Sequence, residues 1–209
     1  MNTVEYFTGY LLGDGYLYYY KKEGKYLVRV ADKSREFLER IRDEMLKVGF
    51  RGHIYRIKGK NAYVLEYSNK SLYFTIKRLS SKLTSSPTAS FVAGIIDAEG
   101  SLERPKRGSV RLVVSNTNVT LLESVAKYLS SLGIKISIRP YGKSRKGEKQ
   151  RYRAIIYGER RVEQVLSSLS PYFTPNFPDF PDPTAGPRVR QRARPPPLVA
   201  IRPSGAGAL

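Results

Sequence analysis

The sequence predicts an α+β fold made of two similar halves related by a pseudo-twofold axis. The first observation is an internal repeat: FTGYLLGDGYL (residues 7–17) and FVAGIIDAEGSL (residues 91–102) both place a carboxylate and a glycine after an apolar segment. The second is that the same order of helical and strand patterns follows both copies. Each half is therefore expected to be an αββαββα unit, in which a four-stranded antiparallel sheet has helices on one face.

In the first half, strand and helix patterns follow the motif in turn. Residues 16–20 and 25–32 are strand-like runs on either side of KKEGK, which predicts a β-hairpin. Apolar residues at helical spacing predict a helix over 33–50 that stops at Gly49. A second hairpin around GKN and a helix over 71–83 complete this half, and TSSPT is the linker.

The second half repeats this order. A motif helix is expected over 88–99, strands near 101–104 and 109–115, and then a helix that ends at Gly133. A hairpin around GKSRKGEK and a helix over ERRVEQVLSSLS follow. The expected domains are residues 1–84 for the first repeat, 85–170 for the second, and 171–209 for a tail rich in Pro and Gly that is partly disordered.

Charge and composition restrict the possible functions. The 209 residues include 37 Lys and Arg against 18 Asp and Glu, which gives a formal net charge of +19. This excess indicates an acidic partner, and nucleic acid is favoured over an anionic membrane surface. There is no cysteine, and His53 is the single histidine; a metal site would therefore use oxygen ligands, which suits Mg²⁺ or Ca²⁺. No apolar run is long enough to span a bilayer, so we expect a cytoplasmic, nucleoid-associated protein without a membrane partner.

Small residues at matching positions predict that the two motif helices pack against each other. Gly9 and Gly13 lie four residues apart in the first motif, as do Gly94 and Ala98 in the second. Such pairs let two backbones approach closely, whereas glycine inside a helix otherwise costs about 1 kcal/mol relative to alanine. A single glycine of this kind is ordinarily a tolerated core residue, but its occurrence in both copies favours an interface between the halves.

A carboxylate ends each motif helix. Asp14 and Glu99 directly precede Gly15 and Gly100, which are expected to end the helices in the left-handed conformation. Helix C-termini carry partial negative charge and unpaired carbonyls, so an acid there is electrostatically unfavourable. If the two helices lie side by side, their acids converge on a site suited to a hard divalent cation. Each acid taken singly would be an exposed turn residue; the repetition favours the paired site.

The segments YLLGDG and AGIIDAEG resemble the two motifs of the LAGLIDADG homing endonucleases. The second copy matches closely, and the first has Leu12 and Gly13 where the family name reads Asp-Ala, but it keeps the final acid. The order of elements over residues 5–170 also resembles the family fold. Two motifs in one chain resemble the monomeric members, of the archaeal, intron-encoded kind.

The resemblance implies a Mg²⁺-dependent, site-specific DNA endonuclease that acts as a monomer. The two sheets would form a saddle in the major groove of a long, pseudo-palindromic target, and both strands would be cut across the minor groove to leave short 3′ overhangs. Asp14 and Glu99 would bind Mg²⁺, with Ca²⁺ or Mn²⁺ as substitutes. The main-chain carbonyls of Gly13 and Ala98 would be further ligands. The metal would activate a water and assist the leaving oxygen.

The family also places a basic or water-orienting group near each acid. In the first half, VADKS offers Lys33 as a third catalytic residue, with Asp32 beside it. The matching VSNTN supplies Asn116 and no lysine. The resemblance leaves two alternatives open. Arg111 or Lys106 replaces the missing lysine, or one DNA strand is cut more slowly. An ordinary solvated side chain is an equally good explanation of Lys33.

Basic side chains at alternating strand positions form the expected DNA-binding surface. In IKISIRPY the isoleucines point one way, and Lys135, Ser137 and Arg139 point the other. Some basic residues would contact phosphates and others base edges, and a solvated strand face is the alternative for any single one. The expected DNA contacts are Arg29, Arg51, His53, Arg56, Lys58, Arg111, Lys135, Arg139, Lys143, Arg145, Arg151 and Arg153.

Three other functions compete with this hypothesis. A maturase-like protein would use the same basic saddle to bind intron RNA. A DNA-binding regulator would keep the fold and lose the acids, which is disfavoured because both acids are present. A basic ribosomal or chromatin protein would leave the duplicated acidic motif unexplained.

Overall fold

The computed structural model describes residues 2–105, 108–142 and 149–172. Within them, both halves have the predicted order of helix, two strands, helix, two strands, helix, so the α+β fold class is confirmed. The elements of the first repeat are α1 (Thr3–Asp14), β1 (Gly15–Tyr20), β2 (Lys25–Asp32), α2 (Arg35–Lys47), β3 (His53–Arg56), β4 (Tyr63–Ser68) and α3 (Lys70–Ser85). Those of the second are α4 (Ala89–Glu99), β5 (Gly100–Glu103), β6 (Arg111–Asn116), α5 (Val119–Ser131), β7 (Ser137–Tyr141), β8 (Arg151–Tyr157) and α6 (Glu159–Leu169).

Each repeat contributes one antiparallel sheet of four strands. The strand order is β1-β2-β4-β3 in the first repeat and β5-β6-β8-β7 in the second. Helices cover one face of each sheet, and the side chains on that face form the core, as the fully buried Val28 and Leu112 illustrate. The opposite face of the first sheet carries exposed tyrosines, including Tyr16 and Tyr18. This alternation gives each sheet an apolar face and an open polar face.

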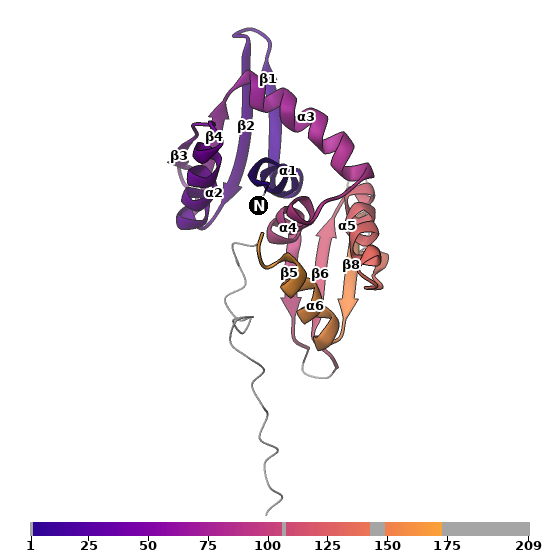
Figure 1. Cartoon of the computed structure of the whole chain (residues 1–209). Helices are drawn as coiled ribbons and strands as arrows, with labels where there is room; N and C mark the ends of the chain where they lie inside the picture. Colours follow the sequence, from indigo (N-terminus) through magenta and orange to yellow (C-terminus); the bar gives the residue numbers. More distant parts are fainter. Residues whose placement is uncertain (1, 106–107, 143–148, 173–209) are drawn as a thin grey trace, which may run out of the picture.

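The motif helices α1 and α4 pack side by side at the centre of the molecule and join the two repeats (Figure 1). Their backbones touch: a Cβ atom added to Gly9 would lie 2.1 Å from the carbonyl oxygen of Phe91. One added to Gly94 would lie 2.1 Å from the carbonyl oxygen of Tyr6. No side chain fits at either position, so the two glycines allow a distance between helices that other residues would prevent.

Polar contacts across α1 and α4 fix how the helices are aligned. The hydroxyl of Thr88, which caps α4, donates to the Glu5 carboxylate in the first turn of α1 at 2.8 Å. Farther along, the hydroxyl of the buried Tyr6 donates to the Asp97 carboxylate at 2.6 Å. Asp97 occupies the motif position where the first repeat has Leu12. The buried Asp therefore has a partner from the other repeat, as a buried polar group requires.

The predicted left-handed glycines at the ends of the motif helices are wrong. Gly15 has φ −128° and ψ −177°, and Gly100 has φ −83° and ψ 147°, so both are extended and begin a strand directly. Glycine is needed for space instead. A Cβ atom added to Gly15 would lie 2.7 Å from the carbonyl oxygen of Arg29. One added to Gly100 would lie 2.3 Å from the carbonyl oxygen of Ile96.

Some expectations fall on parts of the chain that are not described. The predicted DNA contacts Lys143 and Arg145, the alternative basic residue Lys106, and the tail from residue 173 onward lie outside the described residues. Within the part that the structure describes, no helix has both the length and the apolar character that crossing a membrane requires.

Replacing the central glycines with alanine should destabilise the protein. Gly9→Ala and Gly94→Ala should each lower the free energy of unfolding by about 2–3 kcal/mol, because the methyl group forces the two backbones apart. Urea denaturation would measure this. Ser81→Ala, on the exposed side of α3, is the matched control and should change stability by no more than about 0.5 kcal/mol. An unchanged unfolding midpoint in Gly9→Ala would contradict the close contact.

Candidate active site

Asp14 and Glu99 lie at the same end of the helix pair, because each is the last residue of its helix. The side chain of Glu99 lies against the first repeat: a Cβ atom on Gly13 would be 2.9 Å from Glu99 Cγ and 3.5 Å from its Oε1. The same Cβ atom would be 2.6 Å from the Cβ of Ala98. The small residues at positions 13 and 98 thus bring the two helix ends together and leave room for the carboxylates.

The ionisation of both acids is shifted by their surroundings. Burial, together with the Asp14 carboxylate, raises the pKa of the Glu99 carboxyl to about 7. Burial also raises the pKa of Asp14, with a second contribution from the Asp32 carboxylate. Two partly buried acids that repel each other are unfavourable without a positive charge between them.

The donor set fits a hard divalent cation that keeps water in its coordination shell. The available atoms are the carboxylates of Asp14 and Glu99 and main-chain carbonyls such as those of Gly13 and Ala98, all of them oxygens. Over residues 2–105, 108–142 and 149–172, no cluster of three or more His, Cys, Asp or Glu side chains could hold a metal. Two carboxylates with the remaining positions left to water or phosphate are typical of Mg²⁺ sites and not of closed protein cages.

One polar residue at the end of a strand accompanies each acid. In the second repeat, Asn116 at the end of β6 donates from its Nδ2 to Glu99 Oε1 at 2.5 Å. This donor opposes the upward shift in the pKa of Glu99. In the first repeat, Asp32 at the end of β2 accepts a hydrogen bond of 2.7 Å from the hydroxyl of Tyr10. The hydroxyl of Tyr10 is buried, and its pKa is raised by that burial and by Asp32.

The basic residues expected near the acids are arranged differently from the prediction. Lys33 follows Asp32 directly in the chain and is exposed. Arg111 begins β6, whereas Asn116 ends it, so Arg111 lies at the wrong end of the strand to assist Glu99. Arg151 is the cation whose charge lowers the pKa of Glu99. The sequence placed Arg151 among the DNA contacts and gave no sign of this proximity.

On the open face of the first sheet, Arg29 is held by its neighbours. Its guanidinium forms an ion pair with Glu66 and donates to the hydroxyl of Tyr16 at 3.1 Å. Glu66 also accepts from the hydroxyl of Tyr55 at 3.1 Å. His53 lies opposite Glu66 in the register of β3 and β4. Arg29 and His53 therefore belong to one polar row that crosses the sheet.

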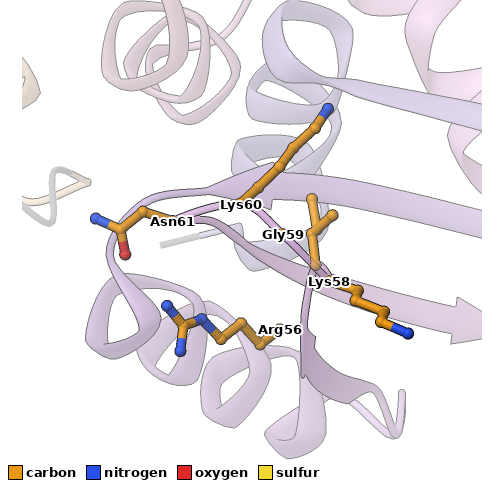
Figure 2. A pocket seen from close by; sticks show the side chains of 6 residues that line it. Arg56, Lys58, Gly59, Lys60 and Asn61 are labelled. Carbon is orange, nitrogen blue, oxygen red and sulfur yellow. The ribbon is translucent and has the colours of Figure 1, made fainter.

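The edge strand β3 of the same sheet carries three of the predicted DNA contacts in or next to it, namely Arg51, Arg56 and Lys58. Arg51 is exposed just before β3, whereas Arg56 alternates with His53 and so belongs to the other side of the strand. A shallow hollow in the turn after β3 is lined by residues 56–61, and its side chains diverge: Figure 2 shows Arg56 and Lys58 pointing away from each other. This turn carries charge but does not converge on a ligand.

On the open face of the second sheet, Glu103 holds two arginines. Arg111 forms an ion pair with it at 2.6 Å, and Arg153 lies 3.7 Å from it. The guanidinium of Arg153 also stacks on Tyr141, 3.4 Å from the ring centroid. Sequence reasoning missed Glu103 and Glu66 as partners, since the pairing depends on strand register. The remaining predicted contacts, Lys135, Arg139 and Arg151, are exposed.

Comparison with known proteins identifies a matching domain family and two relatives. The LAGLIDADG-like domain matches the chain over residues 2–79 and 86–169. Uncharacterized protein MJ0398 of Methanocaldococcus jannaschii is 27% identical over 160 residues, which are 74% of this chain and 56% of that protein. The homing endonuclease I-DmoI of Desulfurococcus mucosus is 27% identical over 144 residues, which are 64% of this chain and 72% of I-DmoI. The chain thus spans little more than half the length of MJ0398.

Solved structures share the fold over most of the chain. A crystal structure of I-DmoI in complex with DNA and Mn has a TM-score of 0.63 and 27% identity, and the match covers 80% of this chain and 96% of that one. Full-length DUF199/WhiA from Thermatoga maritima has a TM-score of 0.56 at 16% identity, over 80% of this chain and 54% of that one, which shows a common fold alone. Since the domain match covers both repeats and both acidic motifs, the chain belongs to the LAGLIDADG-like family, and it is homologous to I-DmoI.

Proposed function

We propose that the protein is a site-specific DNA endonuclease that hydrolyses both strands with a divalent metal. The observation that carries this proposal is the meeting of Asp14 and Glu99 at one end of the helix pair, where burial and mutual repulsion raise the pKa of Glu99 to about 7. A structural role gives no reason for two acids in this position. Relatives crystallised with DNA and Mn, Mg or Ca support the same chemistry.

The residues around the acids have distinct parts in this chemistry. Asp14 and Glu99, with the carbonyls of Gly13 and Ala98, would hold Mg²⁺, and Ca²⁺ or Mn²⁺ would substitute for it. A bound divalent cation lowers the pKa of a coordinated water and polarises the scissile phosphate. Asn116 orients Glu99 through its 2.5 Å hydrogen bond. Each acid would serve one DNA strand.

One cation from each repeat would offset charge on the phosphate. Lys33, next to Asp32 in the chain, would have this role in the first repeat, and Arg151, whose charge lowers the pKa of Glu99, would have it in the second. A guanidinium presents fixed donors to phosphate oxygens, whereas an ammonium acts as a point charge. Arg151 therefore takes the place of the second lysine that the sequence lacks.

The open faces of the two sheets would form the DNA-binding saddle. Arg29, Arg111 and Arg153 are held by carboxylates or aromatic rings, which suits directional contacts to base edges. Arg51, Lys135 and Arg139 are exposed and suit phosphate contacts. With one saddle per chain, the protein would act as a monomer on a long, pseudo-palindromic target and leave short 3′ overhangs. An intron-encoded origin and a nucleoid location fit this function.

An intron RNA-binding maturase, or a non-cleaving DNA-binding protein, is the second candidate. The fold alone does not separate these functions from cleavage, since it is shared with WhiA at 16% identity. The retained acids favour cleavage. A binding selection from pools of DNA duplexes and of RNA transcripts, followed by cleavage in Mg²⁺, distinguishes the three.

Removing either acid should abolish double-strand cleavage and preserve DNA binding. Asp14→Asn and Glu99→Gln should each lower the cleavage rate by about a thousandfold, because ligation of the metal is worth several kcal/mol of transition-state stabilisation. A plasmid library of candidate sites, assayed with and without Mg²⁺, measures cleavage, and gel shifts in Ca²⁺ measure binding. Glu123→Gln, on the exposed side of α5, is the control. Normal cutting by either active-site variant would refute these roles.

Without metal, the protein should lose stability as the pH rises from 4.5 to about 7. The folded state keeps a proton on Glu99 that the unfolded state releases over this range, so ionisation is penalised only in the folded state. Glu99→Gln removes this penalty. Near pH ~8 the free energy of unfolding of the variant should be about 1 kcal/mol higher than that of the parent. Near pH ~4 the two free energies of unfolding should be equal. Urea denaturation in EDTA is the measurement. A parallel pH dependence in both proteins would contradict the repulsion.

DNA affinity should fall steeply with added salt, since many phosphates are neutralised. Arg51→Ala and Lys135→Ala should each reduce the slope of log affinity against log salt by about 1. Fluorescence anisotropy with a labelled duplex over a salt series measures this slope. Arg78→Ala removes an exposed charge on α3, away from the open faces, and should leave the slope unchanged. A flat salt response in the parent protein would argue against the saddle.

A further inference from the structure

The two repeats place different residues at one equivalent position beside the acids. Gly15 pairs with Val30 in the first hairpin, and Gly100 pairs with Val114 in the second. Asp32 lies two residues after Val30 and ends β2, and Asn116 lies two residues after Val114 and ends β6. The two registers therefore make Asp32 and Asn116 equivalent. The pair is close to isosteric, but only the first carries a charge.

The same local turn holds both side chains. Asp32 Oδ1 accepts from the Ser34 backbone N–H at 2.7 Å, and Asn116 Oδ1 accepts from the Asn118 backbone N–H, also at 2.7 Å. Each therefore forms an Asx-turn just before the following helix. This turn needs only one oxygen, which both residue types supply, so it does not explain why the residues differ.

The two side chains differ in the second polar atom of the terminal group, which is an oxygen in Asp32 and a nitrogen in Asn116. Asn116 donates its Nδ2 to Glu99 at 2.5 Å, whereas the second oxygen of Asp32 can only accept and does so from Tyr10 at 2.7 Å. The equivalent of Tyr10, one residue after the central glycine, is Ile95, which has no hydroxyl. Both side chains are fully buried. The first repeat thus has a Tyr–Asp pair where the second has Ile and Asn.

This difference changes the charge beside the acids. Glu99 has an amide donor on one of its oxygens, and a cation must compete with that donor. Asp14 has a second carboxylate nearby, whose charge attracts a cation. Arg151 is close enough to Glu99 to lower its pKa, and Lys33 follows Asp32 in the chain. The difference in acidic charge between the two repeats is therefore one carboxylate.

We propose that Asp32 is a positioning residue that makes the two metal half-sites unequal. The half-site of Asp14 binds a divalent cation more tightly than that of Glu99, so the strand served by Asp14 is cut first when the cation is scarce. The inference rests on the proposed nuclease function and adds to it an order of events. Asp32 acts through its charge and does not need to touch the cation.

Reciprocal exchange of the two residues tests this order. Asp32→Asn and Asn116→Asp each keep the oxygen that makes the Asx-turn, so both folds should survive, which thermal unfolding verifies. Calorimetric titration of the metal-free protein with Ca²⁺ should show that Asp32→Asn weakens the tighter site by about tenfold and that Asn116→Asp strengthens the weaker one by about tenfold. The double exchange should leave the overall Ca²⁺ affinities near those of the parent.

Strand-specific cleavage gives the second measurement. With each strand of a selected target labelled, limiting Mg²⁺ should give nicks mainly in one strand for the parent and mainly in the other for the double exchange. The bias should fade at saturating Mg²⁺, a dependence that a purely structural role would not produce. An unchanged strand order in the double exchange would overturn the inference.

Two further results separate the possible failures. Tyr10→Phe removes the hydroxyl and keeps the carboxylate, so Ca²⁺ affinity should stay within about twofold of the parent; a loss as large as that of Asp32→Asn would overturn the role of charge. If the parent cuts no duplex, the proposed function fails, while the Ca²⁺ titrations still test whether Asp32 makes the half-sites unequal. Identical Ca²⁺ affinities in the parent and Asp32→Asn would overturn the inference even if the parent cleaves DNA.

Discussion

The contact between the backbones of α1 and α4 is the constraint on which the rest of the structure depends. Gly9 and Gly94 each face a carbonyl oxygen of the other helix at a distance that excludes a side chain. The contact continues to Gly13 and Ala98, one residue before each helix ends, so the last residues of the two helices are forced together. The acids are therefore close as a result of packing, and their repulsion is offset by the burial of apolar side chains such as Phe7 and Phe91.

The same constraint explains why the symmetry between the repeats is incomplete. Backbone contact requires small residues at the crossing, and both repeats have them. Other positions on the two helices are free to differ, and they do: Asp97 has a tyrosine partner from the other repeat, whereas Leu12 at the equivalent position is apolar. A single chain can vary each half separately, which a symmetric dimer of one repeat cannot do. Unequal surroundings of Asp14 and Glu99 follow from that freedom.

Most of the fold could be predicted because its signals are local. The repeated motif, strand alternation and helical spacing each depend on residues near in sequence, and the predicted order of elements is confirmed. The site was predicted less completely, since its contacts join residues far apart. The bond from Tyr10 to Asp32 and the ion pair of Arg29 with Glu66 depend on strand register and helix rotation. The extended Gly15 was missed because the close approach of the Arg29 carbonyl comes from a neighbouring strand.

Charge on the open faces is less uniform than a formal net charge of +19 suggests. Glu66 neutralises Arg29, and Glu103 pairs with Arg111 and Arg153, three arginines on central strands of the sheets. The exposed cations Arg51, Lys135 and Arg139 lie toward the edges and turns. An arginine held by a carboxylate has already lost side-chain conformational freedom. When such an arginine makes a directional contact with DNA, it loses less conformational entropy than an unrestrained side chain would. If DNA lies on these faces as proposed, the sheet centres favour recognition of bases and the edges supply attraction to phosphates. The acids that reduce the net charge would thereby increase specificity.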